Sequence, residues 1–178
     1  MKRSIKLWQL MGFSVTSLAG TLLHFLYEWL DKAVWIAPFS SVNESTWEHM
    51  KLLFWPMFLF ALLQSRFFQD QIDFWCVKWK GILVGLFTIP ILFYTYNGVI
   101  GKSPDWINIA IFFVSAAMAY IYEGKLFLRE RKACKHPKRS FLLLCCIGVL
   151  FIIFTFKTPQ IAIFQDPVPN YSVEYKML

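Results

Sequence analysis

The sequence predicts an all-α membrane protein, a polytopic helical bundle with five transmembrane helices in a single domain over residues 1–178. Hydrophobic residues make up 57% of the chain and charged residues only 16%, whereas about a quarter of a soluble domain is charged. Several apolar runs also reach the roughly 20 residues that cross a hydrocarbon core about 30 Å thick. Alternating strands of about ten residues, which predict an outer-membrane barrel, are missing from the sequence.

We expect the five helices at the apolar runs 7–30, 45–64, 74–97, 105–126 and 140–157. The first run follows the basic segment MKRSIK, but it is longer than the apolar region of a signal peptide, so we expect a retained helix. At the start of the second run, Ser45 and Glu48 have the spacing of a capping box. The outer tail, 158–178, is too short and too broken to cross the membrane again.

Basic residues indicate the orientation of the chain. They precede the first helix, recur between the second and third, and are densest between residues 125 and 139. Because basic loops stay in the cytoplasm, we expect a multi-pass plasma-membrane protein with a cytoplasmic N-terminus and an outer C-terminal tail. The net charge of +7 then reflects topology, so we expect membrane lipids as partners and no nucleic acid. The cysteines form no CxxC pair, and a disulfide framework is not expected.

Polar residues gather at the outer ends of the first two predicted helices, where ionisable groups in apolar surroundings mark function. The candidate metal ligands are His24, Glu28, Glu44, Glu48 and His49. Imidazole and carboxylate suit zinc, manganese or iron, so a divalent metal is the expected cofactor. Such an ion lowers the pKa of a bound water to about 7 and supplies hydroxide. A spare carboxylate would then serve as general base.

We expect further polar residues around this site or at its mouth. They are Asn43, Ser45, Trp47, Tyr94, Asn97, Asp105, Asp166 and Tyr171. The loop 31–44 and the tail would cover the site, and the sequence leaves open whether that loop is re-entrant. Glu123, near the inner end of the fourth helix, is expected to pair with Lys78 or Lys125, because an unpaired charge is costly in a membrane.

Each candidate ligand also has a simpler explanation. Glu48 could complete the capping box of Ser45, and Glu44 could favour the positive end of the second helix. His24 and His49 could be hydrogen-bonding groups at the interface, and Glu28 a solvated residue at the rim. The metal hypothesis therefore depends on whether the fold brings these side chains together.

The segments LLHFLYEW, SVNESTWEHMKLLFWP and IFQDPVPNY resemble an uncharacterised family of small integral membrane proteins. The family is found in Gram-positive, clostridia-like bacteria, and its most specific segment here is N-E-S-x-W-E-H. This resemblance covers the whole chain and implies a plasma-membrane location, but it supplies no activity. The tail departs from the family because no glycine stands beside Tyr171 after the Asp-Pro pair.

We expect an outward-facing site of histidine, glutamate and asparagine that binds a metal and, if it is catalytic, hydrolyses a lipid or other amphiphile. One alternative is a small transporter or ligand-binding membrane subunit, in which kinks at Pro56 and Pro90 permit gating. The other alternative is a non-catalytic scaffold, in which the cluster is a structural network. Whether the protein is an enzyme is left open by the sequence.

Overall fold

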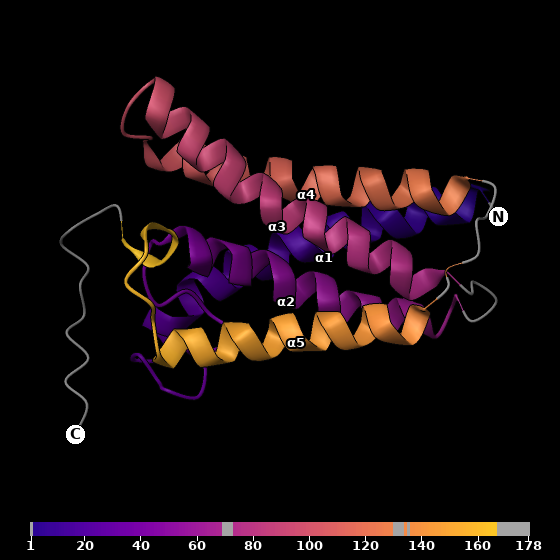
Figure 1. Cartoon of the computed structure of the whole chain (residues 1–178), viewed down its shortest axis with the longest axis horizontal. Coiled ribbons are helices and arrows are strands. Elements are labelled where there is room, and N and C mark those ends of the chain that lie inside the picture. Colours follow the sequence, from indigo (N-terminus) through magenta and orange to yellow (C-terminus); the bar gives the residue numbers. More distant parts are fainter. Residues whose placement is uncertain (1, 69–72, 130–133, 135, 167–178) are drawn as a thin grey trace.

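The computed structural model describes residues 2–68, 73–129, 134 and 136–166, and this part of the chain is all-helical. Five long helices lie side by side along one axis (Figure 1). They are α1 (Lys2–Trp29), α2 (Thr46–Ser65), α3 (Phe74–Val99), α4 (Asp105–Leu128) and α5 (Pro137–Phe156), followed by the short 3₁₀ helix η1 (Ala162–Phe164). The predicted all-α class and its five helices are confirmed, and the largest shift of an end is at α1, which begins before residue 7.

Four of these helices are long and apolar enough to cross a membrane, namely α1 over Arg3–Trp29, α3, α4 and α5. The fifth predicted crossing, α2, does not qualify by length and composition, because Glu48, His49 and Lys51 lower its mean hydropathy. Most of α2 is buried instead, and it contacts all four other helices. Its polar residues can therefore be partnered by protein rather than exposed to lipid.

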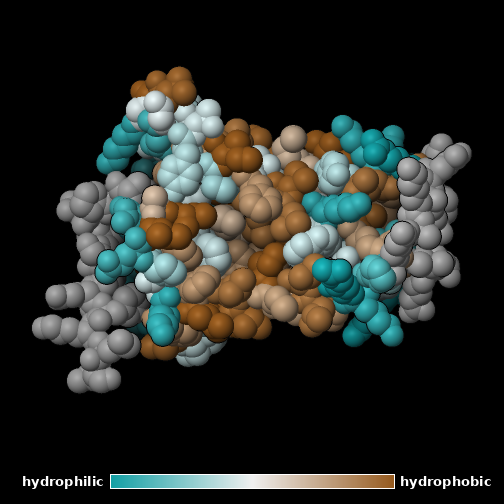
Figure 2. All heavy atoms as spheres, viewed as in Figure 1, coloured by the Kyte–Doolittle hydropathy of each residue, from teal (hydrophilic) through white to brown (hydrophobic). Residues whose placement is uncertain are grey.

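The surface has the pattern expected of a protein in a bilayer. Hydrophobic side chains form a broad central band, and hydrophilic side chains collect toward both ends of the molecule (Figure 2). At the end that carries the α1–α2 connection, Trp29, Trp35 and Trp106 are exposed by 63%, 68% and 66%. Exposed tryptophans of this kind mark the level of the membrane–water interface.

The connection between α1 and α2 folds back into the bundle. Asp31 and Lys32 have positive φ values of 49° and 60°, which reverse the chain after α1. The loop then descends beside α2, where the Trp55 indole donates to the carbonyl of Pro38 at 2.9 Å. The Ser40 hydroxyl accepts from the backbone N–H of Tyr27 at 2.9 Å. The loop therefore folds back against α1 and α2, and protein side chains bond part of its backbone.

A buried ion pair lies near the end of the bundle opposite the α1–α2 connection. The Lys78 ammonium on α3 is 2.6 Å from the Glu123 carboxylate on α4, and both side chains are buried. This pairing was one of the two predicted for Glu123. Gly81 makes room for it, because a Cβ there would lie only 2.1 Å from Cγ of Glu123. A buried charge pair and a glycine together fix the contact between α3 and α4.

The cysteines correct one sequence expectation. The structure joins Cys76, near the start of α3, to Cys134, which precedes α5. The spacing along the chain gave no sign of this pair, because the two residues are 58 positions apart. Their proximity arises only when α3, α4 and α5 pack together.

We predict that Gly81→Ala lowers the midpoint of thermal unfolding in mild detergent, because the added methyl group displaces Glu123 from Lys78. Overpacking of this kind costs about 1–3 kcal/mol. Gly98→Ala is the matched control, since no atom lies within 4 Å of a Cβ at that position of the same helix. Equal midpoints for the two variants would contradict the assigned role of Gly81.

Candidate metal site

Three segments contribute to one polar cluster near the tryptophan-bearing end of the molecule. His24 lies on α1, His49 lies one turn into α2, and Glu44 lies in the loop just before α2. Each residue offers one ligand atom, and these three atoms lie within 4.8 Å of one another. In the described part of the chain, this is the group of histidine, cysteine and carboxylate side chains that could hold a metal ion.

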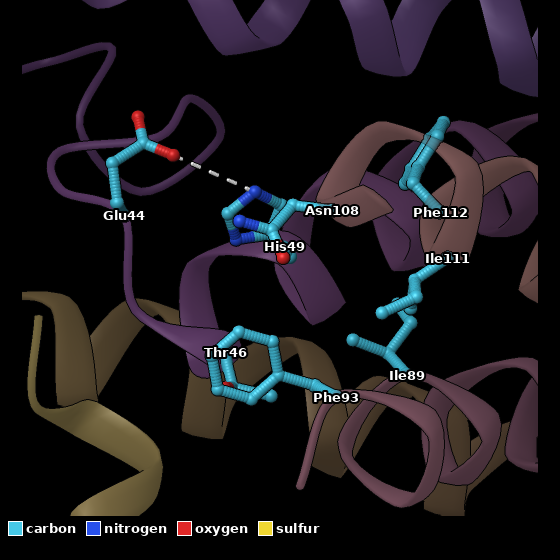
Figure 3. A pocket seen from close by; sticks show the side chains of 8 residues that line it. All are labelled: Glu44, Thr46, His49, Ile89, Phe93, Asn108, Ile111 and Phe112. Carbon is cyan, nitrogen blue, oxygen red and sulfur yellow. Dashed lines mark ion pairs between the residues drawn. The ribbon is translucent and has the colours of Figure 1, made fainter. Parts of the chain in front are cut away.

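The Glu44 carboxylate bridges the two imidazoles. One oxygen lies 3.6 Å from Nε2 of His24, and the other lies 3.6 Å from Nε2 of His49. Two ligands bound at about 2.0–2.1 Å to one tetrahedral zinc are about 3.3–3.4 Å apart. Figure 3 shows the Glu44 carboxylate turned toward the His49 ring. Small side-chain movements would therefore bring all three ligand atoms to a common ion.

Backbone contacts orient His49 for this role. Its Nδ1 lies 3.0 Å from the carbonyl oxygen of Ser45, so the ring donates from Nδ1 and keeps Nε2 as an acceptor. This is the second hydrogen bond that a metal-binding histidine needs to fix its tautomer. Ser45 also caps α2, because its hydroxyl accepts from the backbone N–H of Glu48 at 3.4 Å. Ser45 thus caps α2 at its N-terminus and also fixes the orientation of the His49 ring.

Two other predicted residues hold the Glu44 segment in place. The Asn43 side-chain oxygen accepts from the backbone N–H of Ser45 at 2.9 Å. The Asp166 carboxylate accepts from the backbone N–H of Glu44 at 3.3 Å. The first part of the tail therefore returns to the start of α2.

Glu48 has a different partner from the one the metal hypothesis gave it. It is buried on α2, and its carboxylate lies 2.6 Å from the Lys51 ammonium. The same oxygen accepts from the backbone N–H of Val42 at 2.9 Å. Only half of the predicted capping box is formed, because the Glu48 carboxylate bonds Val42 instead of the N–H of Ser45. Glu48 is therefore not part of the three-residue cluster.

Lys51 is fully buried, and its ammonium has three partners. Besides Glu48, it donates to the carbonyl of Ala37 at 2.8 Å and to the hydroxyl of Thr155 at 3.1 Å. These contacts join α2 to the α1–α2 loop and to α5. Sequence reasoning missed this role, although a lysine three residues after Glu48 in an apolar helix was a visible signal.

Glu28 lies outside the cluster as well. Its carboxylate is 3.7 Å from the Lys32 ammonium, and its side chain is 60% exposed. An exposed pair of this kind contributes at most about 1 kcal/mol. Among the five predicted ligands, the structure thus brings together His24, Glu44 and His49, and it gives Glu28 and Glu48 lysine partners.

A cavity of about 530 Å³ adjoins the cluster, within the usual size range of ligand sites. Its polar lining consists of Thr21, His24, Glu44, His49, Asp105 and Asn108. Its apolar lining consists of Phe25, Leu52, Ile109, Phe112 and Phe113, with Gly20 at the same level. The cavity therefore lies between α1 and α4, with α2 behind it and the possible metal ligands at one end.

A second cavity, of about 10 Å³, lies beside Glu44 and His49 and has room for about one water molecule. Figure 3 shows Ile89, Ile111 and Phe112 on the side opposite Glu44. Asn108 lines both cavities. Its amide is therefore available to a ligand or water near His49, although its side-chain oxygen already accepts from Ser103 at 2.8 Å.

The remaining predicted mouth residues have other surroundings. Asn97 holds the turn before α4, where its oxygen accepts from the backbone N–H of Ser103 at 2.9 Å. The Trp47 ring packs against Phe151 and Phe164, with centroids 4.6 Å away in both cases. Tyr94 is 41% exposed and does not line the described cavities. Tyr171 lies outside the described residues.

Two imidazoles and one carboxylate form a ligand set found in catalytic zinc sites, where a fourth position stays open for water or substrate. The chemistry of the three side chains therefore fits a divalent ion. Asp105 lines the same cavity without belonging to the cluster. It is therefore a candidate for the spare carboxylate that the sequence predicts as general base.

Residues 1–173 match the family described as a family of unknown function, DUF6512. The chain belongs to this family. No curated protein and no solved structure matches the chain. The family membership agrees with the resemblance to an uncharacterised family found in the sequence, and any function has to come from the geometry.

We predict that Lys51→Met strongly destabilises the protein, because it leaves Glu48 charged, buried and unpaired. Breaking a buried pair from one side costs about 3–5 kcal/mol. The double variant Glu48→Gln/Lys51→Met should be less destabilised, since no lone charge remains. Lys32→Met, at the exposed pair with Glu28, is the control and should shift the thermal midpoint little. A double variant as unstable as Lys51→Met would contradict the charge explanation.

Proposed function

We propose that this protein binds one divalent ion, zinc, manganese or iron, through His24, Glu44 and His49, and uses it for hydrolysis of a lipid or other amphiphile. The observation that carries the proposal is the convergence of three ligand atoms within 4.8 Å from three separate segments. Coincidence explains such convergence poorly, because two of the residues lie on helices in apolar surroundings, where polar groups are costly.

Hydrolysis is supported by the neighbourhood of the proposed ion. With three protein ligands, one position remains for a water molecule, whose pKa a bound zinc lowers to about 7. Asp105 and Asn108 line the cavity on the side of α4. Asp105 would take a proton from the water, the hydroxide would add to the ester carbon, and the leaving alcohol would receive the proton.

We further propose that the site faces the outside of the plasma membrane of a bacterial cell. This orientation requires α2 to cross as a fifth helix that is sheltered by the other four. The 20 residues of α2 span about 30 Å at 1.5 Å per residue, which is enough for the hydrocarbon core. One observation opposes the orientation, since the Cys76–Cys134 pair would lie on the cytoplasmic side, where disulfides are rare.

The orientation can be decided by labelling. In a cysteine-free variant, Val34→Cys and Lys138→Cys place single thiols at exposed positions near opposite ends of the bundle. We predict that a membrane-impermeant maleimide labels Val34→Cys on intact cells and labels Lys138→Cys only after permeabilisation. The reverse pattern would place the candidate site in the cytoplasm and overturn the proposed orientation.

We predict near-stoichiometric zinc, manganese or iron in the protein purified in mild detergent, measured by elemental analysis. His24→Ala, His49→Ala and Glu44→Gln should each lose the metal, because each removes one of three ligands. His136→Ala and Glu28→Gln are matched controls and should keep it, since His136 lies near the far end of the bundle and Glu28 pairs with Lys32.

Metal retention should also fall as the pH is lowered, because protons compete for the imidazole and carboxylate ligands. The absence of metal from the wild type, with the three ligand variants merely less stable, would refute a metal site. It would instead favour the scaffold alternative, in which Glu44 joins α1 to α2 as a structural hydrogen-bonding group.

A further inference from the structure

The cavity beside the metal cluster opens sideways, between α1 and α4. Three apolar side chains of its lining, Phe25, Ile109 and Phe113, are exposed by 47%, 58% and 36%. Both helices belong to the four that are long and apolar enough to cross a membrane. Their exposed apolar residues therefore face lipid, and the opening between them leads into the bilayer.

The depth of the opening follows from the helix geometry. Phe113 is eight residues beyond Asp105 and Phe25 is four residues before Trp29, which correspond to about 12 Å and about 6 Å along the helix axes. Trp29 and Trp106, both exposed, mark the interface at this end. Half of a hydrocarbon core is about 15 Å thick. The opening thus spans the upper acyl region of a single leaflet.

The inner end of the cavity is closed. A Cβ at Gly20 would lie 2.4 Å from Cζ of Phe112, so α1 and α4 approach closely there. One turn further along, the hydroxyls of Thr16 and Tyr120 are 2.8 Å apart. The cavity therefore ends where α1 and α4 approach each other closely.

The two ends of the cavity differ in chemistry. Aromatic and aliphatic side chains form one part of the lining. The polar part consists of His24 on α1, Glu44 and His49 at the start of α2, and Asp105 and Asn108 in the first turn of α4. A soluble solute would leave the apolar walls without a partner. An acyl chain lying against Phe25 and Phe113, with its polar group toward the histidines, would satisfy both ends at once.

We propose that the occupant of this cavity is a phosphate-bearing membrane lipid of the tryptophan-marked leaflet, which enters laterally between α1 and α4. This proposal rests on the proposed function for its headgroup contact, because a lipid phosphate would approach Glu44 and Asp105 only with a cation between them. The acyl chain is held by the apolar walls and does not depend on the metal. Lateral entry also explains why the opening is apolar although the site behind it is polar.

The test uses the full-length protein in nanodiscs that contain a small fraction of phosphatidylglycerol with a diazirine in its acyl chain. After irradiation, mass spectrometry locates the crosslinks. We expect enrichment at Phe25, Ile109 and Phe113 over Leu143 and Val149, which are equally exposed apolar positions on α5. Uniform crosslinking of all these positions would overturn the proposal, because it would mean that the opening holds no particular lipid.

Two variants fill the opening. Thr21→Trp places a large ring in the cavity and Ile109→Trp places one at its rim, so crosslinking at Phe113 should fall to the level of Val149. Leu18→Trp, on the lipid-exposed face of α1, is the matched control and should not change it. If a filling variant folds and keeps its metal, but crosslinking at Phe113 is undiminished, the lipid does not occupy this cavity and the proposal fails.

Two further experiments distinguish a failure of the lipid proposal from a failure of the proposed metal site. Millimolar glycerol phosphate should not displace the photoreactive lipid, and displacement would mean that the site takes a soluble phosphate instead. Elemental analysis of the same samples tests the metal independently. Enriched crosslinks in a metal-free protein would support the lipid cavity and refute the proposed function, whereas bound metal with uniform crosslinks would do the reverse.

Discussion

The buried pair of Glu48 and Lys51 is the constraint on which the tryptophan-bearing end of the structure depends. Lys51 joins the α1–α2 loop and α5 to α2, through Ala37 and Thr155. Glu48 holds the same loop at Val42, two residues before Glu44. The ion pair thus binds the loop at two points, Ala37 and Val42. This ion pair therefore helps to place Glu44 beside His24 and His49, together with the contacts of Asn43 and Asp166.

The position of α2 follows from the cost of that pair. Charged groups are expensive in a bilayer unless protein surrounds them. The structure meets this requirement by burying most of α2 against the four other long helices. The pair of Lys78 and Glu123 follows the same rule at the interface of α3 and α4. A buried charge thus either pairs with a residue of another helix, as Lys78 does, or is shielded from lipid by neighbouring helices, as the Glu48–Lys51 pair is. Both requirements make the packing of the helices specific.

Much of the fold could be predicted from the sequence because apolar runs of about 20 residues permit few structures in a membrane. The candidate site was only partly predictable. His24, Glu44 and His49 were noticed as polar residues between apolar runs. The lysine partners of Glu28 and Glu48 were not noticed. A lysine three or four residues away competes with a metal for the same carboxylate, and sequence spacing alone does not say which of the two binds it. The contacts of Ser40 and Pro38 depend on how the loop folds back, which no periodicity records.

The location of the cavity connects the site to the membrane. Gly12, Thr16 and Gly20 let α1 approach Phe60, Tyr120 and Phe112 closely. Next to Gly20, side chains of both helices line the cavity of about 530 Å³. Empty apolar space beside lipid is unfavourable, because its lining loses dispersion contacts. Lipid chains can supply those contacts without further protein. The small residues that bring α1 close to α4 thus end where the cavity begins, and the proposed lipid would meet the polar cluster at that place.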